Sequence, residues 1–244
     1  DFHGCQRQEP PGGAPLRTVQ GTIERTLGYV LGQPIQVLGA SRTDAGVHAL
    51  GQVAAFTAET SIPVEKMPLA ITSRLPEDVQ VRCAEIVEDD FDPIKACTSK
   101  GYRYSILHTG PPRHWPDLFL RRTTTFHRDA LDAAAMDEAA RLLEGEHDFA
   151  SFAHARHGRE STVRCIHSCR VQETGPFSLH LDISGNGFLY NMVRIIAGTL
   201  VEVGRGRIRP EDVVRIRDQR DRSAAGPTLP PHGLCLMWVR YDRP

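Results

Sequence analysis

The sequence lacks the features that mark several large classes of protein. None of its apolar stretches approaches the roughly 20 residues that span a bilayer. No basic and then apolar leader opens the chain, although its first residue is Asp1 rather than Met. The six cysteines in 244 residues do not form the pattern of a disulfide framework. We therefore expect a reduced, cytoplasmic protein with no membrane segment and with mostly buried thiols.

Lysine is also scarce, with 3 Lys beside 26 Arg. The 29 basic and 30 acidic residues give a net charge of -1, so total charge does not indicate a nucleic-acid partner. The distribution is less even, because residues 204–222 contain seven arginines against four acids. Clustered positive charge is what a phosphate backbone senses. An ordinary solvated surface in an arginine-rich protein explains the same cluster, so charge alone leaves both interpretations open.

Several catalytic motifs are missing. We find no Walker A loop, no glycine-rich dinucleotide motif after a strand, no G-x-S-x-G, no H-E-x-x-H and no C-x-x-C. One metal-like pattern places His154 and His157 before Cys165, His167 and Cys169. Alternation along a strand would set the two cysteines about 13 Å apart, too far for ligands of one tetrahedral zinc. We therefore expect a strand face there and no metal site.

The hydrophobic pattern predicts an α+β protein with two similar-sized domains, residues 1–107 and 108–244. The Pro- and Gly-rich stretch 108–117 separates them. Helices are predicted at 19–31, 63–75, 131–143 and 188–203, and strands at 34–38, 51–56, 79–87, 102–107, 163–171, 177–183 and 234–241. Because strands follow one another in the sequence, mainly antiparallel sheets flanked by helices are expected.

One loop and one helix stand out as a candidate site. The loop 39–49 follows a predicted strand and places Arg42, Asp44 and His48 among small residues. By composition alone it also fits an Asx turn with a structural aspartate. In the helix 188–203, Arg194 lies between apolar and small residues, so we expect it to be largely buried. A buried arginine needs a carboxylate, and Asp44 is our candidate partner.

Residues 42–49, Arg-Thr-Asp-Ala-Gly-Val-His-Ala, resemble the active-site signature of the TruA family of tRNA pseudouridine synthases. Other segments resemble further family motifs in the same order: 2–8, 17–21, 75–81, 100–104, 148–152, 187–194, 198–204 and 233–236. So many motifs in the same order are specific, whereas a lone R-T-D-A-G is only suggestive. The chain departs from the pattern at Cys5, where tryptophan is usual, and at 91–94, where Phe-His-Ala-Arg is common. It also begins after the family's opening strand.

This resemblance implies the pseudouridine synthase fold, with an active-site cleft between the domains, and isomerisation of uridine at positions 38, 39 and 40 of the tRNA anticodon stem-loop. It implies a homodimer with tRNA lying across both subunits, and no cofactor, since the reaction is redox-neutral and needs neither ATP nor a metal. By their matching positions, Asp44 is the essential carboxylate, and Arg42, Tyr102, Arg194 and Leu236 line the substrate site. One alternative is a catalytically inactive RNA-binding or RNA-folding module. A hydrolase using Asp44 would lack a second catalytic carboxylate.

Overall fold

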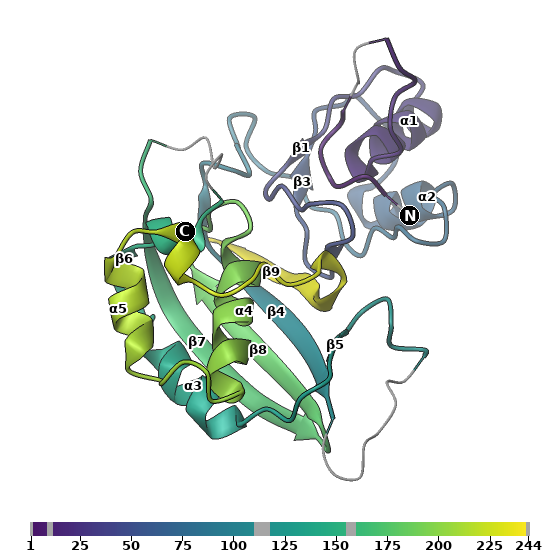
Figure 1. The fold of residues 1–244 in the computed structure, drawn as a ribbon. Helices are drawn as coiled ribbons and strands as arrows, with labels where there is room; N and C mark the ends of the chain where they lie inside the picture. The colour runs from purple at the N-terminus through teal and green to yellow at the C-terminus, as the bar shows by residue number, and fades with distance from the viewer. Residues whose placement is uncertain (1, 9–11, 110–117, 155–159, 243–244) are drawn as a thin grey trace. The chain divides into compact units, whose positions relative to one another are not determined.

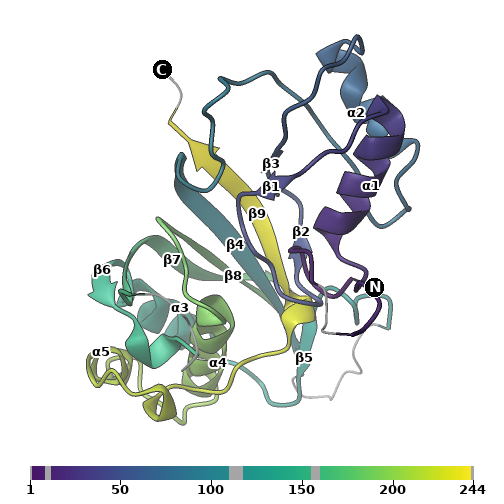
Figure 2. The same cartoon turned by 90° about the horizontal axis from the view of Figure 1, so that it is seen from above.

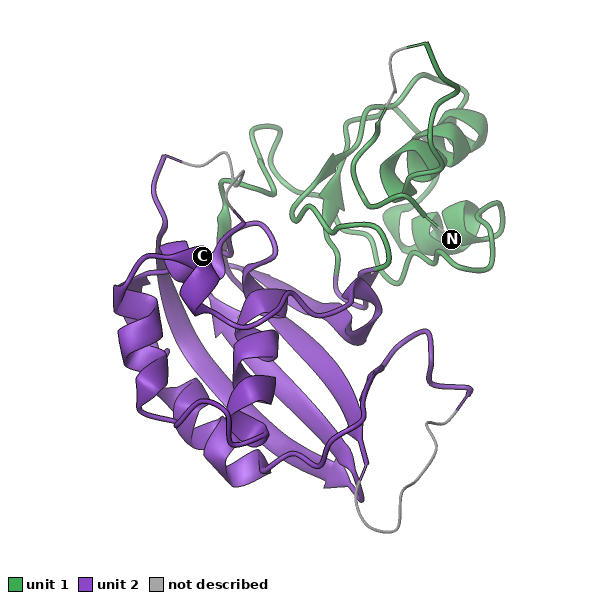
Figure 3. Ribbon diagram, in the orientation of Figure 1, with its two compact units in different colours: residues 1–46, 52–97, 242–244 green, residues 47–51, 98–241 purple. Residues whose placement is uncertain are grey.

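The computed structural model describes residues 2–8, 12–109, 118–154 and 160–242 (Figure 1). The chain divides into two compact units, residues 1–46, 52–97 and 242–244 in unit 1 and residues 47–51 and 98–241 in unit 2 (Figure 3). The chain therefore leaves unit 1 after Gly46, contributes five residues to unit 2, and returns at Gln52. Each unit has a hydrophobic core of its own.

Unit 1 is built around helix α1 (Val19–Leu31), as the apolar spacing predicts. Thr18 Oγ1 accepts a hydrogen bond from the Gly21 N–H at 3.3 Å, and Gly32 ends the helix with a φ of 67°. Such a left-handed C-terminal residue favours glycine. Helix α2 (Met67–Thr72) follows a 3-10 turn (Val64–Lys66), and β1 (Leu38–Gly39) pairs antiparallel with β3 (Ala54–Ala55). The core of the unit consists of Leu27, Ile35, Val37, Met67 and Ile71.

Unit 2 contains a sheet in the order β2-β9-β4-β8-β7-β6, with β5 beside β4. The strands are β2 (His48–Ala49), β4 (Cys97–His108), β5 (Thr125–His127), β6 (Gly145–Asp148), β7 (Val163–Gly175), β8 (Ser178–Gly185) and β9 (Leu234–Tyr241). The long pairs β4/β8 and β7/β8 and the pair β6/β7 are antiparallel, whereas the short pairs β2/β9 and β4/β5 are parallel. The expected α+β class with a mainly antiparallel sheet is confirmed.

Three helices lie on one face of this sheet: α3 (Ala133–Arg141), α4 (Met192–Gly204) and α5 (Asp212–Asp218) (Figures 1 and 2). Short 3-10 turns occur at Ala150–Phe152, Arg222–Ala224 and Pro231–Gly233. Helix α4 is buried all round, with 11 of its 13 residues buried. A helix of this kind is covered on more than one side. None of the helices in the described part of the chain has both the length and the apolar character needed to cross a bilayer.

The structure differs from the predicted elements in several places. Of the predicted strands 34–38 and 51–56, only Leu38 and Ala54–Ala55 are strand, and α5 and β6 were not predicted. Residues 79–87 form no strand, because the Val81 N–H and C=O both bond to Thr72 Oγ1, at 3.0 and 3.3 Å. Helix α4 begins four residues later than predicted, because Asn191 adopts a left-handed φ of 61°.

The predicted domain boundary at residues 107 and 108 also differs from the division into units, which falls after Cys97. The physical reason is β4, whose residues Lys100–Leu107 pair continuously with Gly185–Ser178 of β8 and so join the larger sheet. Most of the Pro- and Gly-rich stretch that suggested the boundary, residues 110–117, lies outside the described residues.

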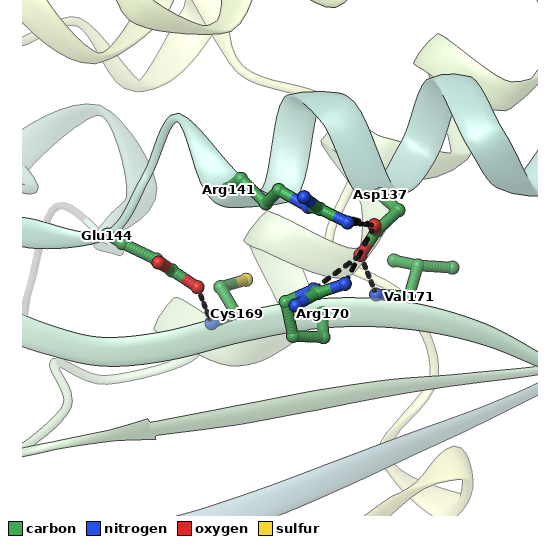
Figure 4. A network of polar contacts seen from close by, with 6 residues as sticks. All are labelled: Asp137, Arg141, Glu144, Cys169, Arg170 and Val171. Carbon is green, nitrogen blue, oxygen red and sulfur yellow. Dashed lines mark hydrogen bonds and ion pairs between the residues drawn. The ribbon is translucent and has the colours of Figure 1, made fainter.

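Asp137 joins α3 to β7 (Figure 4). Its Oδ1 accepts hydrogen bonds from Arg170 Nε and from the Val171 N–H, both at 2.9 Å, and its Oδ2 accepts one from Arg141 at 2.7 Å. Burial alone would raise the pKa of Asp137, but the bonds from Arg170, Val171 and Arg141 outweigh it and lower the pKa to about 2. The ionised carboxylate is therefore favoured in the folded state.

We expect Asp137→Asn to destabilise the protein by about 1–2 kcal/mol at neutral pH, since an amide cannot accept all these bonds. A lowered folded pKa contributes stability that is present above the unfolded value of 3.8 and is lost as pH falls toward about 2. The difference in unfolding free energy between wild type and Asp137→Asn should thus shrink below pH ~4. Urea unfolding at several pH values measures it, and a difference that grows on acidification would contradict this interpretation.

Candidate active site

Asp44 lies in a short turn of unit 1 that follows β1. The β1/β3 ladder continues to Ala40, whose N–H donates to the Val53 carbonyl at 2.8 Å. The chain then turns through Gly46, whose φ of 80° favours a residue without a Cβ. Asp44 is partly buried and Arg42 is exposed. The predicted loop after a strand is therefore present, and the ladder supports its base.

The N-terminal segment supports the same loop from another side. The Cys5 N–H donates to the Thr43 carbonyl at 3.0 Å, one residue before Asp44. Gly4 has a φ of 104°, and a Cβ placed on it would lie 3.1 Å from the Thr43 carbonyl oxygen. The first amides of α1 donate to the same segment, from Val19 to Gly4 and from Gln20 to Cys5. The segment 2–8, one of the family-like motifs, thus connects α1 to the Asp44 loop.

Gln52 is a supporting residue that the sequence reasoning missed. Its side-chain amide donates from Nε2 to the Ser41 carbonyl at 2.7 Å and accepts at Oε1 from the Ser41 N–H at 3.2 Å. Ser41 is only 7% exposed, so these backbone groups need partners. The signal in the sequence was a glutamine near the start of a predicted apolar strand, three residues after the signature segment.

Two predicted substrate residues lie in the core of unit 2. Tyr102, on β4, is 8% exposed and packs edge to face against Phe188, with ring centroids 5.3 Å apart. Leu236, on the neighbouring strand β9, is fully buried and pairs with Ala49 of β2. Its carbonyl accepts from the Leu50 N–H at 2.8 Å. The strand that follows the Asp44 loop is therefore anchored beside Leu236, whose burial also suits a purely structural role.

Arg194 projects from α4 and is partly buried, less than the sequence predicted. Its Nε donates to the Leu229 carbonyl and its Nη1 donates to Asn191 Oδ1, both at 2.7 Å. The Leu229 N–H returns a bond to the Arg194 carbonyl at 3.2 Å. Segment 225–230 thus covers this part of α4, which accounts for the small residues around Arg194.

The arginine-rich segment 204–222 carries less available positive charge than its sequence suggests. Six of its seven arginines form ion pairs with carboxylates, among them Arg205 with Asp129 and Glu202 at 2.6 and 2.7 Å. Arg222 instead donates to Ala225 and Thr228. An ordinary solvated surface, one of the two interpretations that the sequence left open, therefore accounts for most of these arginines.

The unusual Asp92 has a local role. Its Oδ1 accepts hydrogen bonds from the N–H groups of Ile94 and Lys95 at 2.8 and 3.1 Å. These two backbone bonds, that from Lys95 first, lower the pKa of its carboxyl. The departure from Phe-His-Ala-Arg thus places a turn-capping side chain where the family commonly has histidine.

The Cys/His pattern in β7 follows a different alternation from the one predicted. A register shift between Ile166 and Ser168 interrupts the ladder with β8 and leaves His167 exposed, while Cys169 is fully buried. Burial raises the pKa of the Cys169 thiol well above its ordinary value, which disfavours the thiolate that binds metals. His157 lies outside the described residues. Within the described part of the chain, no group of three potential metal ligands is found.

The candidate residues are thus divided between the two units. Arg42 and Asp44 belong to unit 1, whereas Tyr102, Arg194 and Leu236 belong to unit 2. Arg42 and Asp44 share one supported loop, and Tyr102 and Leu236 share one sheet.

Comparisons with known proteins agree with these motifs. The family model described as tRNA pseudouridine synthase matches residues 1–94 and 139–242. A protein of Moorella thermoacetica named tRNA pseudouridine synthase A is 44% identical over 224 residues, covering 92% of this chain and 89% of the relative. A Bacillus subtilis protein of the same name is 42% identical over 243 residues, covering 99% of this chain and 94% of the relative. The similarity therefore extends over both units.

Proposed function

Because the chain belongs to the tRNA pseudouridine synthase family, we propose that it isomerises uridine to pseudouridine in the anticodon stem-loop of tRNA, at positions 38, 39 and 40. The observation that carries the proposal is the intact signature, residues 42–49, within a similarity that spans nearly the whole chain. The bond between C1′ and N1 of the nucleotide breaks, the uracil turns, and C1′ bonds to C5. No atom is added or lost overall.

Asp44 is the essential carboxylate in this proposal. Breaking a glycosidic bond develops positive charge on the sugar, and an ionised carboxylate stabilises that charge. Asp44 either attacks C1′ or removes a proton from C2′ to give a glycal, and both routes start from the ionised form. The supports of its loop at Thr43 and Ser41 favour a fixed carboxylate position.

The other candidate residues bind and orient the substrate. Arg194 pairs with Asp44 and keeps it ionised, which an opposite charge nearby favours. Tyr102 contacts the uracil, and Leu236 forms an apolar wall of the base pocket. Arg42 occupies the space left by the extruded nucleotide. Extrusion costs a few kcal/mol of unstacking, which contacts to the RNA must offset.

An inactive RNA-binding module of the same fold is the alternative. It was suggested by Cys5 and by the sequence 91–94. What argues against it is that Arg42, Asp44 and Arg194 are all retained, while Asp92 has a structural use of its own.

The proposal extends to partners and location. The enzyme acts on tRNA as a homodimer in the cytoplasm, where tRNA is modified. All six cysteines are free thiols, which supports a reducing compartment.

Incubation with an unmodified tRNA transcript tests the activity. Pseudouridine retains a carbodiimide adduct that stops primer extension, so stops at positions 38–40 are expected only after treatment with the enzyme. Because the reaction leaves the RNA mass unchanged, mass spectrometry provides the control against base loss. A protein that binds the tRNA but produces no carbodiimide adduct at positions 38–40 would favour the inactive module.

We expect Arg194→Met to lower activity and stability together. The substitution removes the bonds to Leu229 and Asn191, which should cost about 1–3 kcal/mol of unfolding free energy. It also removes the charge that holds Asp44 ionised, so kcat should fall at least about tenfold. Arg194→Lys keeps the charge without the planar fork and should recover part of the activity. A fully stable and fully active Arg194→Met protein would contradict the proposed pairing of Arg194 with Asp44.

A further inference from the structure

Gln52 makes four hydrogen bonds at the base of the Asp44 loop. Besides its two bonds to Ser41, its Oε1 accepts from the Val53 N–H at 3.3 Å and its Nε2 donates to Cys5 Sγ at 3.6 Å. A side-chain amide has two N–H donors and two acceptor lone pairs, so its whole hydrogen-bonding capacity is used. Turning the amide over would set its NH₂ against two N–H groups, so these bonds select one orientation.

These bonds lie at the end of the β1/β3 ladder, where the chain enters the Asp44 loop. Leu38 pairs with Ala55 and Gly39 with Ala54, and the Ala40 N–H reaches the Val53 carbonyl. Directly beyond this bond, the Gln52 side chain bonds both the N–H and the C=O of Ser41. The strand therefore ends in a fixed direction three residues before Asp44.

The same amide also connects Ser41 to the N-terminal segment. Cys5 is 9% exposed, and while its Sγ accepts from Gln52, its backbone N–H donates to Thr43. Gln52 and Cys5 thus hold the loop at Ser41 and Thr43, on both sides of Arg42. Cys5 stands where the family usually has tryptophan, so the thiol contact is a feature of this chain.

We propose that Gln52 is a positioning residue for catalysis: its amide holds both backbone groups of Ser41 at the base of the loop and so sets the direction in which the Asp44 carboxylate points. This inference rests on the proposed function of Asp44. Gln52 itself touches neither the carboxylate nor the substrate in this scheme.

The test compares Gln52→Ala with Gln33→Ala under single-turnover conditions on an unmodified tRNA transcript. Gln33 is a matched control in unit 1, because its amide also bonds both backbone groups of one residue, donating to the Glu59 carbonyl at 2.6 Å and accepting from the Glu59 N–H at 3.4 Å. Misplacing a reacting group by about 1 Å costs about 100-fold in rate. We expect Gln52→Ala to lower the rate constant at saturating enzyme about 100-fold, with tRNA affinity nearly unchanged, and Gln33→Ala to leave the rate constant unchanged.

For Gln52→Glu, a positioning role predicts a pH-dependent activity relative to wild type, and a purely structural role does not. Its carboxylate accepts from Ser41 and Val53 but sets an oxygen against the Ser41 carbonyl, where Nε2 now donates. Protonation of that carboxyl restores a donor. The activity of Gln52→Glu relative to wild type at the same pH should therefore rise as pH is lowered.

The outcomes separate this inference from the proposed function. Equal rate constants for Gln52→Ala and Gln33→Ala, or a loss confined to tRNA affinity, would overturn the positioning role, as would a pH-independent ratio for Gln52→Glu. Failure of the proposed function would show differently, as a wild-type protein that makes no pseudouridine or an Asp44→Ala protein that still does.

Discussion

Asp44→Ala should abolish pseudouridine formation while tRNA binding persists. The physical reason is that the positive charge developing at the sugar then has no anionic partner, and no second catalytic carboxylate is assigned to replace it. We expect the rate to fall at least about 10⁴-fold, to the background of the assay. Carbodiimide labelling and primer extension measure the product, and filter binding measures the affinity for tRNA.

Asp44→Asn is the matched variant for this experiment. It preserves the shape of the side chain and the loop bonds at Ser41 and Thr43, since those are made by the backbone. It should be as inactive as Asp44→Ala. Unchanged activity in either variant would discard the assignment of the essential carboxylate.

Gly198→Ala should destabilise the protein strongly, although alanine normally favours a helix by about 1 kcal/mol over glycine. A Cβ on Gly198 would overlap the carbonyl oxygen of Pro227, which belongs to the segment covering α4. That contact is with backbone, so no flexible side chain can move away. We expect a loss of roughly 3 kcal/mol, or a decrease in Tm of about 6–12 °C, measured by calorimetry.

The loss in Gly198→Ala should extend to activity, because the displaced segment also holds Arg194 through Leu229. Gly28→Ala, in α1, is the control: its Cβ would meet only the Gln33 carbonyl oxygen at an ordinary 3.5 Å. That variant should be as stable as wild type or slightly more stable. A Gly198→Ala protein that behaves like Gly28→Ala would contradict the close packing described for α4.

Elements whose signals are local could be predicted from the sequence. Helix α1 occupies the predicted residues because Thr18 and Gly32 define its ends, and β9 occupies the predicted residues 234–241. The predictions that the structure does not match concern segments whose conformation depends on bonds to other parts of the chain. Residues 79–87 have an apolar pattern, but Val81 bonds to a threonine side chain, and β4 joins the larger sheet although it precedes the Pro-rich stretch.

The candidate site also contains features with local sequence signals and features that depend on contacts distant in the sequence. The loop that carries Asp44 and the small residues around Arg194 are visible in one sequence, whereas the roles of these two residues stay predictions. Gln52 could not, because its role depends on a side chain reaching back 11 residues to Ser41 and across to Cys5. The pairing of the arginines in 204–222 likewise depends on carboxylates such as Asp129 and Asp148, which are distant in sequence.

Release of tritium tests the central claim most directly. Formation of the bond from C1′ to C5 expels the hydrogen at C5 of the uracil, so a tRNA transcript carrying tritium at that position reports the isomerisation itself. The wild-type protein should release tritium to water in proportion to the uridines at positions 38–40, with the RNA chain intact, and Asp44→Ala should release none. Tightly bound tRNA from which the wild-type protein releases no tritium would contradict an isomerase that depends on Asp44.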